Sequence, residues 1–211
     1  MARTAVVILN YNGVGFLEEF LPSVIEHSEQ ADVIVADNCS TDDSLSFLST
    51  NYPDIQTIVL EENTGYAGGY NNALAQLSHE YFVLLNSDIE VTPNWIEPII
   101  QFMDERPEVA ACQPKILDFH NKTHFEYAGA AGGFLDVLGY PYCRGRMLDD
   151  IEKDESQYDE NLKIFWATGA CMFVRQADFD AANGFDASFF AHMEEIDLCW
   201  KLHHLGKEIY C

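Results

Sequence analysis

Three groups of polar residues each follow a short apolar run. The groups are Asn10-Tyr11-Asn12, Asp37-Asn38 and Asn86-Ser87-Asp88. If the apolar runs are parallel strands, these groups lie at the carboxyl ends, where open α/β sheets bind their ligands. Any one group is explained equally well as a turn. Their recurrence at successive strand ends favours a binding edge.

A glycine-rich segment, Glu62–Asn71, follows the third apolar run and leads into a predicted helix. Backbone N–H groups at the start of a helix bind anionic groups, so this segment is suited to a diphosphate. It lacks the GxGxxG spacing of dinucleotide-binding proteins and the Lys-Ser/Thr pair of a Walker loop. The sequence therefore indicates diphosphate binding without either of those two motifs.

Asp88 comes directly after the apolar run Val83–Leu85. Mg²⁺ and Mn²⁺ prefer oxygen ligands, and they often take one or two carboxylates while substrate phosphates complete the shell. Asp88 is therefore a candidate metal ligand. The alternative is that it caps a helix near Pro93.

Three acids, Glu194, Glu195 and Asp197, lie where a helix is predicted to start. A carboxylate that is ionised near neutral pH can take a proton from an attacking hydroxyl, as a general base does. The alternative is that these acids only complement the positive end of the helix dipole.

The chain has 211 residues and a formal net charge of −24, which argues against nucleic acid as a partner. The negative charge of the protein repels an anionic ligand, and a divalent cation bound at the site would offset that repulsion. No apolar run is long enough to span a bilayer, and the N-terminus lacks a signal peptide pattern. We therefore expect a cytoplasmic protein, with contact at the inner face of the membrane in the full-length form.

The first half of the chain alternates between predicted strands and helices. Strands are expected at Thr4–Leu9, Val33–Ala36, Gln56–Leu60 and Tyr81–Leu85, and helices at Val14–His27, from Thr41 or Asp42 to Ser49, Ala67–Leu77 and Pro93–Glu105. This alternation with short connections predicts a parallel, three-layer α/β sheet.

The second half is less regular. Strands are expected at Val109–Leu117, Lys163–Ala167, Cys171–Arg175 and Lys207–Cys211, a helix at Met193–Leu205, irregular structure or a hairpin at Phe125–Gly145, and a solvated, mobile loop at the acidic residues 149–160. The chain stops inside the last predicted strand. We therefore expect it to be truncated at the C-terminus relative to a longer protein.

Five motifs in this order and spacing resemble the family 2 glycosyltransferases with the GT-A fold, near the rhamnosyltransferase-like branch. They are Val7–Asn12, Val35–Asp42, Asn63–Gly69, Leu85–Asp88 and Glu194–Leu198. The resemblance implies one domain over residues 1–211: an α/β/α sandwich with a mostly parallel, Rossmann-like sheet and a smaller mixed second half. Residues 1–105 would form the nucleotide-binding half, and residues 106–211 the acceptor-binding and catalytic-base half.

The resemblance also implies roles for single residues on the donor side. Asn10 and Asn12 would line the nucleotide pocket, and Asp37 would accept a hydrogen bond from the base, with Asn38 nearby. The residues expected to border the nucleotide and diphosphate are Asn63 and Gly68.

On the reaction side, Asp88 would bind Mn²⁺ or Mg²⁺ as the remaining acid of a DxD-type motif in which Asn86 replaces the first acid. A histidine beyond the last strand often adds a metal ligand in the family. Glu195 would be the catalytic base, with Glu194 as its rival. The further candidates at the reaction centre or on the acceptor side are Asp197, Thr168 and Gly169.

The function implied is that of an inverting glycosyltransferase that moves a sugar from a nucleotide-diphosphate sugar to an acceptor hydroxyl. A glycan or a lipid-linked glycan of the cell envelope is the expected acceptor. One alternative is a non-catalytic or regulatory nucleotide-sugar-binding domain. A nucleotidylyltransferase is disfavoured because the loop after the first strand, Asn10–Gly15, carries no lysine or arginine to hold a triphosphate.

Overall fold

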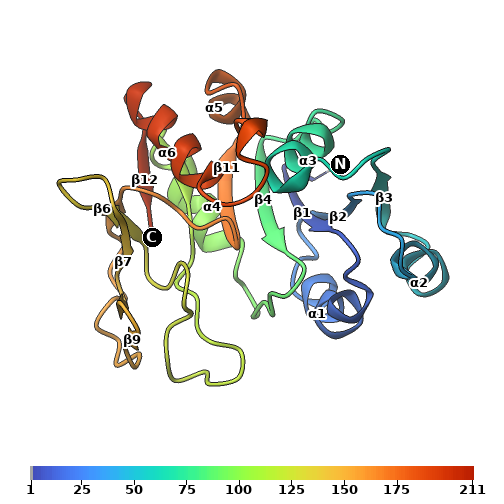
Figure 1. Ribbon diagram of the computed structural model, residues 1–211, viewed down its shortest axis with the longest axis horizontal. Coiled ribbons are helices and arrows are strands. Elements are labelled where there is room, and N and C mark those ends of the chain that lie inside the picture. Colours follow the sequence, from blue (N-terminus) through green and yellow to red (C-terminus); the bar gives the residue numbers. More distant parts are fainter. Residues whose placement is uncertain (1) are drawn as a thin grey trace.

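The computed structural model describes residues 2–211. Its main sheet contains β1 (Thr4–Asn10), β2 (Asp32–Asp37), β3 (Gln56–Val59), β4 (Tyr81–Asn86), β5 (Val109–Cys112), β10 (Lys163–Ile164), β11 (Cys171–Arg175) and β12 (Glu208–Tyr210). The spatial order is β10-β12-β5-β11-β4-β1-β2-β3 (Figure 1). β11 is antiparallel to both of its neighbours and β10 is antiparallel to β12, while the other pairs are parallel. The expected mostly parallel sheet with a mixed second half is confirmed.

Helices cover both faces of this sheet. They are α1 (Val14–Glu26), α2 (Ser44–Asn51), α3 (Gly65–Leu74), α4 (Glu97–Asp104), α5 (Gln176–Ala181), α6 (Glu194–His204) and the short 3-10 helix η1 (Ala187–Phe189). Residues along β1 alternate between the faces, as a strand requires. Val6 and Ile8 pack with α1, α2 and α4, whereas Ala5 and Val7 pack with α3, α5 and α6. The three-layer arrangement is therefore confirmed.

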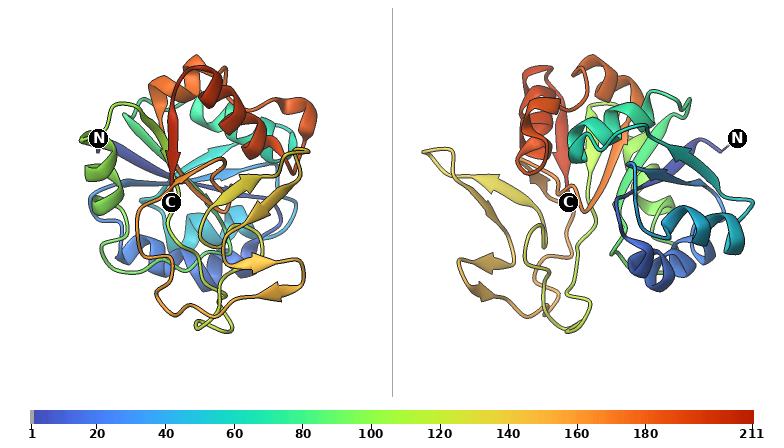
Figure 2. Two further views of the ribbon diagram at one scale, coloured as in Figure 1. Left: turned by 90° about the vertical axis from the view of Figure 1, so that its left-hand side faces the viewer. Right: turned by 45° about the vertical axis from the view of Figure 1, so that its right-hand side comes forward.

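Two small hairpins extend from the sheet on one side of the molecule (Figure 2). One pairs β6 (Gly133–Leu135) with β7 (Pro141–Cys143), and the other pairs β8 (Arg146–Met147) with β9 (Asp150–Ile151). The acidic residues 149–160 thus include a strand, and Lys115 pairs with two of them, Asp154 at 2.7 Å and Asp159 at 2.6 Å. Their mobility stays a prediction.

Several predicted boundaries were wrong. α4 begins at Glu97 instead of Pro93, since Asn94 has a left-handed backbone with φ of 61°. β5 ends at Cys112, two residues before Pro114, which has no N–H for a ladder. β10 stops at Ile164 because the next two backbone N–H groups donate to Gly133 in β6.

Two helices also begin at unexpected residues. α2 starts at Ser44, whose N–H donates to the Asp42 carboxylate at 3.0 Å. α3 starts at Gly65, two residues before the predicted Ala67. Gly65 has a φ of 73°, which turns the chain from the preceding loop into the helix.

The sheet register brings the predicted site segments to one edge. Asn10 pairs with Asp37 across β1 and β2, and Leu9 pairs with Asn86 across β1 and β4. β11 runs the other way, so its first residue, Cys171, pairs with Leu85. The segment Thr168–Ala170 therefore lies at the same edge as the carboxyl ends of β1, β2 and β4.

Candidate active site

Asn10 and Asp37 form a buried hydrogen-bonded pair at the predicted nucleotide side. The Asn10 amide nitrogen donates to one Asp37 oxygen at 3.0 Å, and the backbone N–H of Ser40 donates to the other at 2.9 Å. Both side chains are buried, with no exposed surface. The Asn10 Oδ1 atom lacks a hydrogen-bond partner in the described residues. The contact of Asp37 with a nucleotide base stays a prediction.

The other predicted amides shape the neighbouring loops. Asn12 Oδ1 accepts from the backbone N–H of Thr41 at 2.7 Å, which fixes the turn before α2. Asn38 Nδ2 donates to Asn63 Oδ1 at 3.0 Å, and the same Asn63 oxygen accepts from the Gly65 N–H at 2.9 Å. The structure thus connects Asn38, Asn63 and the start of α3 through hydrogen bonds.

The backbone N–H groups at the start of α3 already have partners within the protein. Tyr66 and Ala67 donate to the Phe190 carbonyl oxygen, at 2.7 and 3.3 Å. Gly68 is buried, and a Cβ on it would lie 2.6 Å from the Thr64 side chain. In this conformation the amides of Tyr66 and Ala67 are not available to a diphosphate. The roles of Asn63 and Gly68 beside the diphosphate stay predictions.

Asp88 is exposed just beyond β4, and within residues 2–211 its carboxylate makes no hydrogen bond or ion pair. Glu126 is its neighbour: burial raises the pKa of Glu126, and the negative charge of Asp88 raises it further. No group of three or more His, Cys, Asp and Glu side chains in the described chain is arranged to hold a metal. A free carboxylate in a negative field suits Mn²⁺ or Mg²⁺ whose remaining ligands come from phosphate or water. Asp88 therefore fits a one-carboxylate metal site.

The two glutamates at the start of α6 differ in exposure. Glu194 is 4% exposed, whereas Glu195 is only partly buried, and each has one Oε atom without a hydrogen-bond partner in the described chain. Burial raises the pKa of both carboxyl groups, and the charge of Glu194 raises that of Glu195 further. Asp197 Oδ2 lies 2.7 Å from Lys201 Nζ, as an ion pair without hydrogen-bond geometry. Glu195 thus has more exposed surface than Glu194 and a raised pKa, although its Oε2 atom is itself buried.

Electrostatic neighbours connect Glu195 to the Asp88 side of the site. Burial raises the pKa of the Cys143 thiol to about 11. The positive charge of Arg146 lowers this pKa, and the negative charges of Glu126 and Glu195 raise it. Cys143 in β7 therefore lies within the electrostatic range of both carboxylates.

Thr168 and Gly169 lie in the segment that precedes β11. Thr168 Oγ1 donates to the Ala128 carbonyl at 3.1 Å, and the Thr168 N–H donates to the buried Gln113 side chain at 2.9 Å. The Gly169 carbonyl accepts from the Tyr66 hydroxyl at 2.6 Å. Sequence reasoning missed Tyr66, Glu126 and Gln113 as site residues. Tyr66 lay inside a recognised motif, but no spacing pattern marked the other two.

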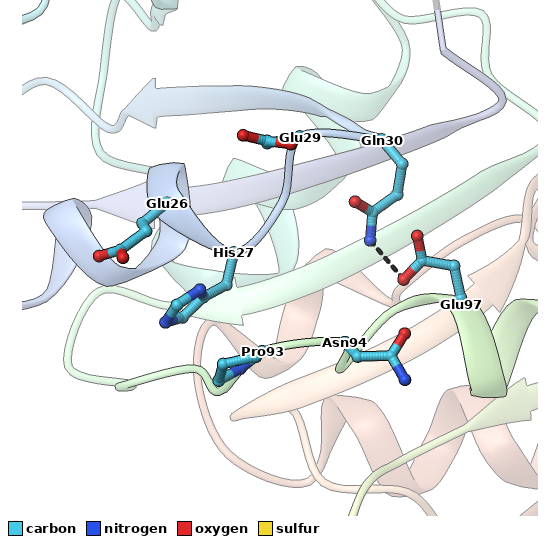
Figure 3. A pocket seen from close by; sticks show the side chains of 7 residues that line it. All are labelled: Glu26, His27, Glu29, Gln30, Pro93, Asn94 and Glu97. Atoms are coloured by element: carbon cyan, nitrogen blue, oxygen red, sulfur yellow. Dashed lines mark hydrogen bonds between the residues drawn. The ribbon is translucent and has the colours of Figure 1, made fainter.

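A surface depression lies elsewhere, beside the C-terminal end of α1 (Figure 3). It is lined by Glu26, His27, Glu29, Gln30, Pro93, Asn94 and Glu97. None of the predicted site residues lines it, and its one internal hydrogen bond in Figure 3 joins Gln30 to Glu97 at 2.6 Å. Its three glutamates make it unsuitable for an anionic donor.

The three-layer sandwich, with amides and carboxylates at the strand-end edge, is the GT-A glycosyltransferase architecture. The chain belongs to glycosyl transferase family 2, whose family profile matches residues 5–181. This confirms the resemblance that the five motifs indicated.

Curated relatives support the rhamnosyltransferase-like branch. The N-acetylglucosaminyl-diphospho-decaprenol L-rhamnosyltransferase of Mycobacterium tuberculosis is 27% identical over 220 residues, covering 95% of this chain and 70% of the relative. Rhamnosyltransferase WbbL of Escherichia coli is 24% identical, covering 97% of this chain and 78% of the relative.

Solved structures share the fold at low identity. The mannosyltransferase PcManGT from Pyrobaculum calidifontis, in complex with GDP-Man and Mn²⁺, has a TM-score of 0.67 at 18% identity. GalNAc-T7 with UDP, GalNAc and Mn²⁺ has a TM-score of 0.75 at 14% identity. This chain is covered almost completely, by 98% and 100%, but spans only 53% and 42% of those two chains.

Proposed function

We propose that this chain is part of an inverting glycosyltransferase in which Glu195 is the general base. The observation that carries the proposal is the pair at the start of α6: a partly exposed Glu195 whose pKa is raised by burial and by Glu194. A base with a pKa moved toward neutrality is matched to removing a hydroxyl proton. Family membership and the strand-end amides support a nucleotide-diphosphate sugar as the donor.

The reaction would be one in-line displacement. As Glu195 takes the proton of the acceptor hydroxyl, the acceptor oxygen bonds to the anomeric carbon and the bond from that carbon to the diphosphate oxygen breaks. The nucleoside diphosphate leaves with the electron pair of that bond. Mn²⁺ or Mg²⁺ held by Asp88 would offset the charge of the departing diphosphate. Asn10, Asn12, Asp37, Asn38, Asn63 and Gly68 would hold the nucleotide side, and Thr168 and Gly169 would border the acceptor.

The alternative is a nucleotide-sugar-binding domain without turnover. A panel of uracil-, thymine- and guanine-containing nucleotide sugars, with Mn²⁺, separates the two functions by measuring sugar transfer and donor hydrolysis. Turnover by the wild type that is lost in Glu195→Gln supports the enzyme. Donor binding with no turnover on any acceptor supports the binding domain.

We further propose a lipid-linked glycan of the cell envelope as the acceptor, used at the cytoplasmic face of the membrane. The M. tuberculosis relative carries such an acceptor, diphospho-decaprenol, in its name. The tip of the β6–β7 hairpin supports this choice, because Val137 is 100% exposed and Leu138 is 79% exposed. The segment from Val137 to Cys143 contains no charged residue, which suits contact with acyl chains. Within residues 2–211, no helix has the length and apolar character to cross a bilayer.

A further inference from the structure

Helix α3 holds both ends of the segment that leads to the proposed base. At one end, the Asn71 side chain makes two bonds to the backbone of Phe185: Nδ2 donates to the carbonyl at 2.8 Å, and Oδ1 accepts from the N–H at 3.0 Å. At the other end, the Phe190 carbonyl accepts the N–H groups of Tyr66 and Ala67. Residues 185–190, which include η1, are thus fixed to α3 at two points.

The second attachment requires a glycine at the start of α3. A Cβ on Gly65 would lie 2.3 Å from the Phe190 carbonyl oxygen and 2.7 Å from the Phe190 ring carbon Cγ. The φ of 73° at Gly65 is also unfavourable for other residues. The carbonyl therefore reaches the helix only because this position has no side chain.

The path from this attachment to Glu195 is short. Only residues 191–193 separate Phe190 from Glu194, the first residue of α6. Three residues extend at most about 11 Å, so the start of α6 lies close to Phe190. His192 and Met193 hold left-handed conformations, with φ of 72° and 74°, which costs free energy and persists only when neighbouring contacts fix it.

We propose that Asn71 is a positioning residue for Glu195, acting through the backbone of residues 185–190. The proposal rests on the proposed function, because it takes Glu195 as the base. Both hydrogen bonds of the Asn71 side chain go to Phe185, so the residue acts on the base through the segment and not through the substrate. Asn71 also lies on the second turn of α3, and its side chain makes no hydrogen bond to Asn38 or Asn63 in the described chain.

The test compares Asn71→Ala with Asn72→Ala. Asn72 is exposed, and its side chain makes one long bond, 3.4 Å to Thr64, so it is a matched control. Misplacement of a reacting group by about 1 Å costs on the order of 10²-fold in rate. We expect Asn71→Ala to lower kcat by about that factor, with the donor KM unchanged, while Asn72→Ala keeps the wild-type kcat. The acid limb of the kcat profile should also move to lower pH, since a displaced Glu195 gains water.

Amide hydrogen exchange gives a second readout that does not need turnover. In Asn71→Ala, the N–H groups of Tyr66 and Ala67 should exchange faster, because the segment that bonds them is released at its other end. Asn71→Asp keeps the acceptor for the Phe185 N–H but places a carboxylate oxygen against the Phe185 carbonyl, which also only accepts, so the N–H groups of Tyr66 and Ala67 should again exchange faster than in the wild type. This variant serves if the alanine variant does not fold. Unchanged exchange, or a kcat equal to that of Asn72→Ala, overturns the proposal. If the wild type shows no turnover, the proposed function is wrong. The exchange rates of the Tyr66 and Ala67 N–H groups in Asn71→Ala still show whether Asn71 fixes residues 185–190 to α3.

Discussion

The phenolic hydroxyl of Tyr66 donates a 2.6 Å hydrogen bond to the carbonyl oxygen of Gly169. This bond joins the first turn of α3 to the segment that precedes β11. Burial raises the pKa of Tyr66 well above its ordinary value, and the nearby charges of Glu194 and Glu195 add to the effect. Tyr66 therefore stays protonated and keeps donating across the physiological pH range.

Replacing Tyr66 by Phe should remove this bond while the ring packing remains. One net hydrogen bond contributes about 0.5–1.5 kcal/mol, and the Gly169 carbonyl is left without its donor. We expect a loss of stability of that size in urea unfolding, together with slower turnover. Tyr127→Phe is the control, because Tyr127 is 54% exposed. Equal stability of the two variants would show that the Gly169 contact contributes nothing.

The two adjacent glutamates should differ sharply in their contribution to rate. Glu195→Gln keeps the shape and cannot accept a proton, and the loss of a general base typically costs about 10²–10⁴-fold. Donor affinity should barely change, because under this proposal the base would face the acceptor and not the diphosphate. Glu194→Gln should cost much less, because Glu194 is enclosed at 4% exposure. The comparison uses initial rates of transfer, and an inactive Glu194→Gln beside an active Glu195→Gln would reverse the assignment.

The pH dependence of the rate follows from the raised pKa of Glu195. The ionisable groups that act on it or respond to its charge are the adjacent Glu194, His192 three residues earlier, Tyr66 on α3, Cys143 on β7 and Cys199 on α6. Because the base must be ionised, kcat/KM should fall as the pH drops through a pKa above the ordinary 4.5 of a glutamate. A rate profile that stays flat down to pH 4.5 would contradict this assignment.

The same carboxylate should reduce stability at neutral pH. A glutamate whose pKa is raised by folding stabilises the fold below its unfolded pKa, and this stability is lost as the pH rises through the folded value. Glutamine does not ionise, so Glu195→Gln removes this loss of stability at neutral pH. A gain of 1 kcal/mol corresponds to about 2–4 °C in Tm for a chain of this length. We expect Glu195→Gln to melt higher than the wild type at pH 7.5 and equally at pH 4, as measured by calorimetry.

Nucleoside diphosphate binding should depend on metal through Asp88. A chain with a net charge of −24 repels an anionic ligand, and one carboxylate is free at the predicted metal position. Titration calorimetry with Mn²⁺, and then with a chelator, should give much weaker binding in the second case. Asp88→Asn should weaken binding with Mn²⁺ to nearly the chelator level, while the exposed Asp54→Asn should not. Equal affinity with and without metal would remove this role from Asp88.

The hairpin tip should determine binding to lipid vesicles. Transfer of one leucine side chain from water into an apolar phase is worth enough free energy for about a tenfold change in partitioning. We expect Leu138→Ser and Val137→Ser each to reduce co-sedimentation with phosphatidylcholine vesicles. Val59→Ser, at a position 57% exposed on β3, is the control. Transfer to a soluble acceptor analogue should be unaffected by all three changes.

The layer architecture, and the sheet edge where the candidate site lies, follow from patterns in the amino-acid sequence. A short apolar run such as Thr4–Leu9, followed by turn residues, favours a buried strand, and helical spacing in α1 leaves one apolar face for the sheet. Polar residues at strand ends then meet at one edge, since parallel strands share their direction. These features depend on residues that are neighbours in the chain, so periodicity alone predicts them.

The contacts between distant residues around the candidate site are visible only in the folded chain. The Phe190 carbonyl accepts hydrogen bonds from the backbone N–H groups of Tyr66 and Ala67, and nothing in the spacing of those residues predicts that contact. The same holds for Glu126 beside Asp88 and for the different exposure of Glu194 and Glu195. Sequence patterns report which face of an element is apolar. The burial and charge that set a pKa depend on which elements pack together, and long-range contacts determine that packing.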